Sequence, residues 1–246
     1  MISVCIATYN GERFIRQQLE SIIHQLTSDD EIIVSDDIST DSTLDIIRSF
    51  QSPIIQIFTN NGKHGYTPNF ENAIRHAHGD YIFLSDQDDI WQPDKVKICM
   101  QHFKHCDFII SDALLINANN QVIANSFFAL RRSRPGLIAN LVRFSYLGCC
   151  IAFHRKILDR ALPFPPHHHL CTHDNWLTLI AMTYYKTTVV NDKLIQYRRY
   201  GNNTSTGGLH NSTSIRFKIA YRLYLVWWLL VRGYKQNGKA FIRHFE

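Results

Sequence analysis

The chain has 246 residues, 45% of them hydrophobic, and a formal net charge of +5 at pH 7. This size predicts one substantial hydrophobic core, or one core with a small appendage. From Thr213 onward the chain has seven Lys or Arg and one acid, so this segment carries +6 and residues 1–212 sum to −1. A slightly acidic body, with its basic charge around one apolar segment, argues against nucleic-acid binding.

The N-terminal sequence and the pattern of cysteines predict a protein located in the reducing interior of a cell. No positively charged leader with an apolar core is present, because residues 2–9 are typical of a strand, so we expect a cytoplasmic protein. The cysteines form no C-x-x-C pair and several lie within apolar runs, which predicts buried, reduced thiols without disulfides. They are Cys5, Cys99, Cys106, Cys149, Cys150 and Cys171.

Short apolar runs alternate with segments of helical period in the first half of the chain. The runs predict strands at residues 2–9, 31–36, 54–60, 80–86 and 107–112. Apolar residues three and four apart predict helices at residues 12–25, 42–50, 69–78 and 94–105. This alternation predicts an α/β fold with a mostly parallel, Rossmann-like sheet flanked by helices. In such a sheet, ligands bind beyond the carboxyl ends of the strands.

The second half of the chain is less regular. A basic loop, "RRSRPG", precedes an apolar "YLGCCIAFHR", and a helix is expected at residues 173–185. A last strand is expected from residue 194, running into a loop that reaches residue 208. Residues 214–245 have a helical period and a different composition, so we place a boundary at residues 208–213. It separates a main domain, residues 1–210, from a basic amphipathic helical segment, residues 211–246.

Three polar loops follow predicted strands at one edge of the sheet, and one of them holds Asp86, Asp88 and Asp89. Carboxylates this close repel one another and raise each other's pKa unless a positive charge lies between them. One interpretation is a solvated turn that caps the next helix, although Asp94 already suits that position. The other is a site for Mg²⁺ or Mn²⁺, hard cations that prefer carboxylate and phosphate oxygens.

The loop "VSDDISTDST" also allows two interpretations. Asp36 and Asp37 can open a βα loop whose Ser39, Thr40 or Asp41 caps the next helix. They can also accept hydrogen bonds from a nucleotide base or a ribose hydroxyl. No G-x-G-x-x-G is present and "NNGKHGYT" lacks the first Gly of a P-loop, which argues against a dinucleotide enzyme or a P-loop kinase.

Four ordered stretches carry a family resemblance: "SVCIATYNGERFIRQQLESI", "IIVSDDISTDST", "NFENAIRHAHGDYIFLSDQDDIWQPDKV" and "HDNWL". Together they resemble family 2 of the inverting glycosyltransferases, which has the GT-A fold, over residues 1–200. The resemblance implies that Asp86 and Asp88 lie near the diphosphate of a nucleotide sugar and its Mg²⁺ or Mn²⁺, with Asp88 as the direct ligand. It also implies a donor-binding set of Ala7, Thr8, Tyr9, Asn10, Asp36, Asp37, Lys63, Asn69 and Gln87.

Asp174 matches the acidic position that this family uses as catalytic base. A carboxylate is needed there because the acceptor hydroxyl loses its proton as it attacks the anomeric carbon. One displacement inverts the configuration, so no covalent sugar–enzyme intermediate is required. A helix N-cap is the alternative interpretation. Family members often have Glu-Asp at this place, whereas this chain has His173 before the acid, which predicts that His173 tunes or orients the base.

The histidine-rich loop contains a further cluster of candidate metal ligands. His167, His168, His169, Cys171 and His173 suggest zinc, but their spacing fits no standard zinc pattern, so an acceptor-side loop is expected.

"RRYGNN" resembles the terminal motif of rhamnosyltransferase-like members, with Tyr200 where His is common. Arg198 and Arg199 are expected to bind the diphosphate. This branch makes rhamnose the first choice of sugar, linked to dTDP or UDP.

The C-terminal segment contains "AYRLYLVWWLLVRGYK". Its uninterrupted apolar core, residues 223–231, is far shorter than the roughly 20 residues needed to cross a bilayer. Trp227 and Trp228 with flanking cations favour a helix lying on an anionic membrane surface. The alternatives are a helix that packs on the main domain, or on a second subunit in a homodimer.

These inferences predict a peripheral enzyme at the inner face of the bacterial plasma membrane. It is expected to extend a polyprenyl-diphosphate-linked glycan during O-antigen or capsule synthesis. Two rivals remain: a sugar nucleotidylyltransferase, which needs a Gly-rich, basic triphosphate loop after the first strand, and a non-catalytic sugar-nucleotide or glycan-binding module. "TYNGERF" offers the first rival a single Gly, and a binding module has no use for a base at Asp174.

Overall fold

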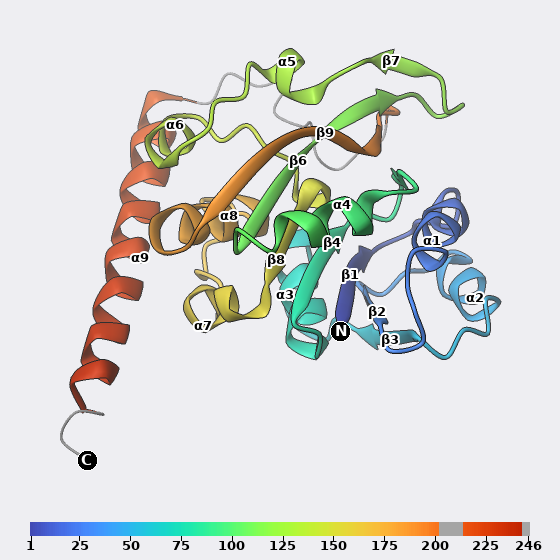
Figure 1. Cartoon of the computed structure of the whole chain (residues 1–246), viewed down its shortest axis with the longest axis horizontal. Coiled ribbons are helices and arrows are strands. Elements are labelled where there is room, and N and C mark those ends of the chain that lie inside the picture. Colours follow the sequence, from blue (N-terminus) through green and yellow to red (C-terminus); the bar gives the residue numbers. More distant parts are fainter. Residues whose placement is uncertain (202–213, 243–246) are drawn as a thin grey trace.

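The computed structural model describes residues 1–201 and 214–242, with side chains described up to residue 234. Within these residues one mixed sheet has the strand order β3-β2-β1-β4-β8-β6-β9-β5, and β7 pairs with β6 (Figure 1). The strands are β1 (Ile2–Thr8), β2 (Glu31–Asp36), β3 (Ile55–Thr59), β4 (Tyr81–Ser85), β5 (Ile90–Trp91), β6 (Phe108–Ile116), β7 (Val122–Ala124), β8 (Ile151–His154) and β9 (Thr187–Arg198).

The helices cover both faces of this sheet. They are α1 (Ile15–Ile23), α2 (Thr43–Arg48), α3 (Tyr66–His76), α4 (Lys95–His102), α5 (Phe127–Arg131), α6 (Leu137–Val142), α7 (Leu158–Ala161), α8 (His173–Tyr184) and α9 (Ile215–Ile242), with short 3₁₀ turns η1 (Gly148–Cys150) and η2 (Arg155–Ile157). Successive residues of a strand face opposite sides, so Val4 and Ile6 enter the core cluster that includes α1, and Cys5 enters the one that includes α3 and α8. Two buried faces explain why β1 and β2 have continuous apolar runs.

The predicted α/β architecture is confirmed, with a division in the sheet. β1 pairs in parallel with β2 and β4, and β2 with β3, as βαβ units require. Beyond β4 the sheet is mixed, because β8 is antiparallel to β4 and to β6. All six cysteines are buried free thiols.

Several elements of the structure differ from the sequence prediction. α3 begins at Tyr66 because Gly65, at a φ of 120°, ends the preceding loop in a conformation that favours glycine. β9 begins at Thr187 and lies along β6. β5 was not predicted; its two residues pair with Ile195 and Gln196 of β9.

α9 lies along one edge of the molecule, on the side opposite α1 and α2 (Figure 1). Its Leu225 and Leu229 are buried in the core cluster with α8. Tyr184 donates a hydrogen bond to the Leu229 carbonyl at 2.6 Å, and Tyr221 donates one to the Leu141 carbonyl at 3.0 Å. One face of α9 therefore packs on the main domain. The expected domain boundary, residues 208–213, lies outside the described residues.

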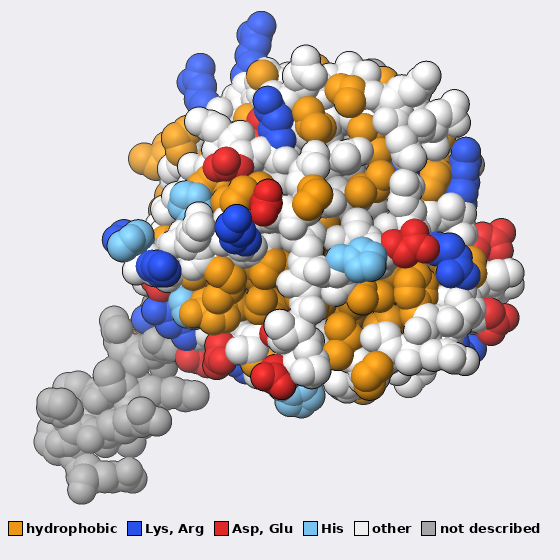
Figure 2. Space-filling view, turned by 45° about the vertical axis from the view of Figure 1, so that its right-hand side comes forward, with side chains coloured by type: hydrophobic (Ala, Val, Ile, Leu, Met, Phe, Trp, Pro, Cys, Tyr) orange, Lys and Arg blue, Asp and Glu red, His pale blue; other side chains and the backbone are white. Residues whose placement is uncertain are grey.

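No helix within the described residues has the length and apolar content needed to cross a bilayer. On the face shown in Figure 2, acidic and basic side chains are interspersed with apolar ones. That distribution agrees with the nearly neutral charge of residues 1–212.

Glu31 ties three strands together at the amino-terminal edge of the parallel half. It is buried and accepts hydrogen bonds from the Ser3 hydroxyl at 2.6 Å, the His78 backbone N–H at 2.5 Å and the Gln56 amide at 3.2 Å. Burial alone raises the pKa of Glu31, but the hydrogen bonds from Ser3 and His78 outweigh it and leave the pKa lowered.

We expect Glu31→Gln to lower the free energy of unfolding by about 2 kcal/mol, because charge-assisted bonds become neutral or are lost. The stabilisation by an acid of lowered pKa is present above its unfolded pKa and is lost as pH falls through its folded pKa. The variant should therefore lose less stability than the wild type between pH 5 and pH 3, measured by urea unfolding at each pH. Equal acid slopes in the two proteins would contradict this role.

Candidate active site

A cavity of about 960 Å³ lies at the carboxyl ends of β1, β2 and β4. Its lining comes from the loops after these strands, from the start of α3, from residues 144–148 and from the start of α8. Parallel strands end at the same edge of a sheet, and β1 lies between β2 and β4, so their loops must meet there. The predicted location of the ligand site is therefore where the structure has a cavity.

The turn between β4 and β5 carries the three carboxylates and is called the acid turn below (residues 86–89). Asp86 and Asp88 line the cavity, and Asp89 is fully buried beneath it. Burial, and then the charges of Asp88 and Asp174, raise the pKa of Asp86 to about 7. Burial and the two neighbouring acids also raise the pKa of Asp89 well above its usual range. Positive charge placed beside these acids would favour their ionised forms.

Two buried cations lie next to the acid turn. Lys95 donates a hydrogen bond from Nζ to the Cys149 carbonyl at 2.9 Å, and its charge opposes the raised pKa of Asp86 only in part. Arg198 donates from Nε to the Asp88 carbonyl at 2.7 Å and from its backbone N–H to Asp89 Oδ1 at 2.9 Å. These contacts fix the shape of the turn.

The structure does not place Arg198 or Arg199 in the cavity lining. The Arg198 side chain is fully buried and also binds Gln17 Oε1 at 2.8 Å and Asn120 Oδ1 at 2.5 Å. Its guanidinium lies 4.3 Å from the ring centroid of Phe14. Arg198 therefore stabilises the acid turn through hydrogen bonds from its buried side chain and its backbone. Arg199 donates its backbone N–H to the Ile116 carbonyl at 2.7 Å, which continues the β6–β9 pairing.

Tyr200 does reach the site. Its hydroxyl donates a hydrogen bond to Asp88 Oδ2 at 2.8 Å, and its ring packs 4.9 Å from that of Phe14. The acid thereby raises the pKa of Tyr200 further than burial alone does. Tyr200 thus contacts the acid that was predicted to bind metal.

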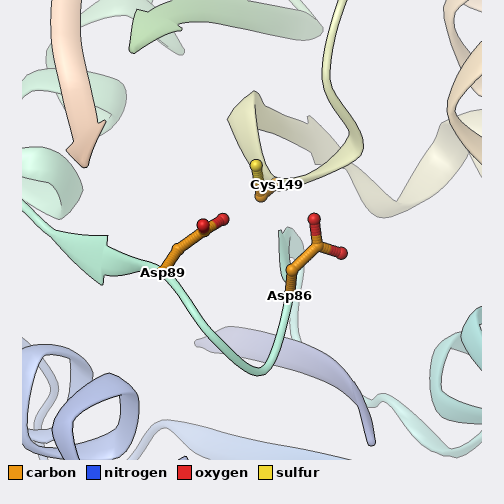
Figure 3. Close-up of side chains that lie close together, drawn as sticks. All are labelled: Asp86, Asp89 and Cys149. Carbon is orange, nitrogen blue, oxygen red and sulfur yellow. The ribbon is translucent and has the colours of Figure 1, made fainter. Parts of the chain in front are cut away.

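Figure 3 shows Asp86, Asp89 and Cys149, whose ligating atoms all lie within 4.8 Å of one another. The metal prediction named Asp86 and Asp88, and the structure adds Asp89 as a candidate oxygen donor. Burial raises the pKa of the neighbouring Cys149 thiol, which makes it a poor ligand for a hard cation. The three acids fit a divalent cation, because the clustered carboxylates need positive charge and the buried Asp89 Oδ2 has no hydrogen-bond partner among the described residues. No sequence pattern marked Cys149, since it comes from η1, far from the acid turn in sequence.

The predicted donor-binding residues fall into two groups, those that line the cavity and those that do not. Ala7, Thr8, Tyr9, Asp37 and Asn69 line the cavity, whereas Asn10, Asp36 and Lys63 do not. The carboxylate of Asp36 accepts hydrogen bonds from Thr8 Oγ1 at 2.9 Å and from Ser39 Oγ at 2.6 Å, which holds the two loops together.

The cavity-lining residues of this group are also held firmly. Asp37 accepts from the Gly65 N–H at 2.8 Å and the Asn60 amide at 2.7 Å. Gln87 binds the Tyr9 backbone twice, at its N–H (2.8 Å) and its carbonyl (3.0 Å). The first-strand loop and the acid turn are therefore joined directly.

Asp174 lies in the first turn of α8 and lines the same cavity. Its Oδ1 accepts hydrogen bonds from the Thr172 hydroxyl at 2.5 Å and the Asn175 N–H at 2.8 Å. Within the described residues, Oδ2 accepts none. The orientation of Asp174 is thus fixed through one oxygen, and the other remains for a ligand.

The histidine-rich stretch does not assemble as a zinc site. His173 lines the cavity and Cys171 is buried, but His167, His168 and His169 are not in the lining. Within the described part of the chain, the metal-ligating side chains that cluster are those of Figure 3. The sequence also gave no signal for Gly148, Phe144 and Tyr146, which complete the cavity wall.

Comparison with known proteins shows the family to which the chain belongs. The sequence model of Glycosyl transferase family 2 matches residues 3–162. The dTDP-rhamnosyl transferase RfbG of Shigella flexneri is 31% identical over 238 residues, which cover 88% of this chain and 77% of that protein. The UDP-Glc:alpha-D-GlcNAc-diphosphoundecaprenol beta-1,3-glucosyltransferase WfgD of Escherichia coli is 27% identical over 185 residues, covering 73% and 70%.

Two solved structures share the fold. S. aureus TarS 1–349 in complex with UDP-GlcNAc superposes with a TM-score of 0.70 at 19% identity, over 91% of this chain and 65% of that one. The mannosyltransferase PcManGT from Pyrobaculum calidifontis, in complex with GDP-Man and Mn²⁺, superposes with a TM-score of 0.62 at 18% identity, covering 97% and 74%. The predicted GT-A fold is confirmed. The family match over residues 3–162, with the 31% identity to RfbG, shows that this chain is a glycosyltransferase belonging to glycosyl transferase family 2.

Proposed function

We propose that this glycosyltransferase transfers a sugar, with rhamnose as the first choice, from a dTDP- or UDP-linked donor to a lipid-linked oligosaccharide, with inversion. The product belongs to a bacterial surface polysaccharide such as O-antigen or capsule. The observation that carries the proposal is one cavity lined both by Asp86 and Asp88 and by Asp174. A displacement needs these two elements: stabilisation of a leaving diphosphate, and a base for the attacking hydroxyl.

Asp174 accepts the proton of the acceptor hydroxyl through Oδ2. The hydrogen bonds from Thr172 and Asn175 hold Oδ1, so the carboxylate keeps one orientation while Oδ2 takes the proton. The acceptor oxygen then forms its bond to the anomeric carbon as the bond to the diphosphate breaks. No residue has to form a covalent bond to the sugar.

Asp86 and Asp88, with Asp89 beside them, would hold Mg²⁺ or Mn²⁺. When bound, the cation supplies positive charge that stabilises the diphosphate as it leaves. Tyr200 and Arg198 keep the carboxylate and the backbone of Asp88 in place for this. Lys95 adds a fixed positive charge behind the turn.

The nucleotide is proposed to bind along residues 7–9, with Asp37 and Asn69 beside it. Asn69 donates to the Thr8 carbonyl at 3.0 Å, while its buried Oδ1 has no partner among the described residues and can accept a hydrogen bond from a ligand. Asp36, Asn10 and Lys63 support these loops. Asn10 accepts the Thr40 N–H at 2.8 Å, and the Lys63 carbonyl accepts the Asn60 amide at 3.0 Å.

The names of two relatives support the finer parts of the proposal. RfbG is named for dTDP-rhamnose, and WfgD for an acceptor in which GlcNAc is linked to diphosphoundecaprenol. At 31% and 27% identity these names motivate the choice of sugar and acceptor to test. They also favour transfer over the two rival functions.

The nucleotidylyltransferase alternative is disfavoured by the hydrogen bonds of the first-strand loop. A triphosphate would need free backbone N–H groups there. The N–H groups of Tyr9, Asn10, Gly11 and Glu12 instead donate to the side chains of Gln87, Ser39, Thr43 and Asp41.

The helix α9 supports peripheral binding to the inner face of the plasma membrane. Its outward side carries an apolar stripe, consisting of Ile219, Leu223, Val226, Trp227, Leu230 and Tyr234, each at least 40% exposed. Arg222 and Arg232 turn inward and donate to carbonyls of the main domain. We therefore assign residues 211–246 as a docking segment attached to a catalytic domain of residues 1–210. A homodimer through the same stripe is the alternative.

Asp174→Asn is expected to reduce sugar transfer by roughly 10²- to 10⁴-fold, because the amide cannot accept the proton. Donor binding should remain, since Asn keeps the shape and an Oδ1 acceptor. Transfer rates and donor-induced melting shifts measure the two effects, with the exposed Asp159→Asn as control. Transfer at the normal rate would show that the base is another residue.

Asp88→Asn is expected to abolish the rise in melting temperature that a nucleoside diphosphate gives in the presence of Mn²⁺. A ligand that binds only the folded state stabilises it, and the variant lacks the carboxylate charge that holds the cation. Tyr200→Phe is the matched variant: it removes the hydrogen bond to Asp88 and keeps the charge, so most of the shift should persist. A full Mn²⁺-dependent shift in Asp88→Asn would refute the metal assignment.

Replacing Leu223 and Trp227 together by Ser is expected to weaken binding to vesicles of anionic lipid by at least about tenfold, because two exposed apolar side chains no longer enter the interface. The control replaces Val122 and Ile123 of β7, each 55% exposed, by Ser. Co-sedimentation with vesicles measures binding. Unchanged vesicle binding together with loss of a dimer in analytical ultracentrifugation would favour the subunit interface instead.

A further inference from the structure

We propose that His173 binds a ring hydroxyl of the donor sugar and so selects which sugar is transferred. The inference rests on the proposed use of a nucleotide sugar and adds a specificity residue to it. The imidazole of His173 is buried and has unused hydrogen-bonding capacity. His173 is only 4% exposed, yet neither Nδ1 nor Nε2 has a hydrogen-bond partner among the described residues. Buried polar atoms are rarely left this way, since each costs roughly 1–3 kcal/mol.

The ring is held by aromatic contacts on its faces and edges. It stacks on Phe70 with centroids 4.1 Å apart and planes at 23°, and Tyr66 approaches at 5.9 Å and 72°. The His173 backbone N–H donates to Thr67 Oγ1 at 3.2 Å. These contacts fix the position of the imidazole without using its nitrogens. His173 belongs to the lining of the cavity, and both of its ring nitrogens are buried and unused by hydrogen bonds among the described residues.

Gly148 shows how close the imidazole lies to the reacting region. A Cβ added at Gly148 would lie 2.6 Å from His173 Nε2 and 3.5 Å from the Cβ of Asp174. The next residue, Cys149, belongs to the acid cluster of Figure 3. In a single displacement the anomeric carbon must lie between the departing diphosphate and the oxygen that Asp174 deprotonates. His173 therefore borders the space that the transferred sugar has to occupy.

The chemistry of a neutral imidazole suits a hydroxyl. One ring nitrogen donates and the other accepts, and a sugar hydroxyl can do both. Burial lowers the pKa of His173, which favours this neutral form. A site built to bond a hydroxyl rejects a sugar that lacks it or presents it in the other configuration, because the buried nitrogens then remain unpaired.

A purely structural role for His173 predicts a different effect of substitution. If His173 only filled the space beside Phe70, a phenyl ring would do so equally well and would remove two unpartnered polar atoms. His173→Phe is therefore expected to leave the melting temperature of the free protein unchanged or raised. A matched control exists in α3, where His76 stacks on Phe58 with centroids 3.9 Å apart and planes at 20°, outside the cavity lining.

The experiment compares wild type, His173→Phe, His173→Gln and His76→Phe. Melting temperatures are measured alone, with dTDP or UDP and Mn²⁺, and with the corresponding nucleotide sugars, in the absence of acceptor. We expect His173→Phe to keep the nucleoside diphosphate shift and to lose the further shift that the sugar adds, with donor affinity reduced by roughly 10- to 100-fold. His173→Gln, which can donate and accept, should recover part of it. His76→Phe loses the hydrogen bond between its ring and the Asn72 carbonyl but should keep the sugar-dependent shift of the wild type.

Two results would overturn the proposal. An unchanged sugar-dependent shift in His173→Phe would remove His173 from donor binding. A large fall in the melting temperature of the free variant would show that the nitrogens have a structural role. If no nucleotide sugar stabilises the wild type, the proposed function itself fails, and this inference with it.

Discussion

The site depends on holding three carboxylates together against their mutual repulsion. The acid turn achieves this because it is closed at both ends by the sheet: β4 precedes it, and β5 follows it and pairs with β9. That pairing brings Arg198 under the turn, where its backbone binds Asp89 and its side chain binds the Asp88 carbonyl. The remaining negative charge would attract a divalent cation, and the cation would then offset the charge of a diphosphate. A fold that neutralised it fully would have no affinity left for the metal.

The parallel half of the sheet supplies the second constraint. Because β1 lies between β2 and β4, the loop after β1 contacts both neighbours, through Asp36 on one side and Gln87 on the other. The loop after β1, the loop after β2 and the acid turn, where we propose that the nucleotide and its diphosphate bind, are thus joined by side-chain hydrogen bonds. The antiparallel β8 then brings η1, with Gly148 and Cys149, to the other side of the acid turn.

The sequence predicted what local periodicity and ordered motifs encode, and it missed what depends on distant contacts. The four strands of the parallel half and helices α1 to α4 follow from apolar spacing, and the acids from their crowding in one turn. β5 could not be predicted, since two residues form a strand only through pairing with β9. Neighbouring acids gave no sign that Asp37 lines the cavity while Asp36 ties the loops. Arg198 was expected at the diphosphate, and the structure buries its side chain outside the cavity lining, which charge alone does not reveal.

Several buried polar atoms without partners among the described residues gather at this site. Asn69 Oδ1, Asp89 Oδ2 and both nitrogens of His173 belong to three different elements, and each is costly in the free protein. Unpartnered buried atoms also occur elsewhere among the described residues, as at Trp91 Nε1 and Thr187 Oγ1, whereas Glu31 is satisfied by Ser3, Gln56 and His78. The atoms at this site differ in position, because Asn69 and His173 line the cavity and Asp89 lies in the acid turn, where the proposed ligand would pair with them. On the proposed function, the stability lost there in the free state would become binding energy for the cation, the nucleotide and the sugar.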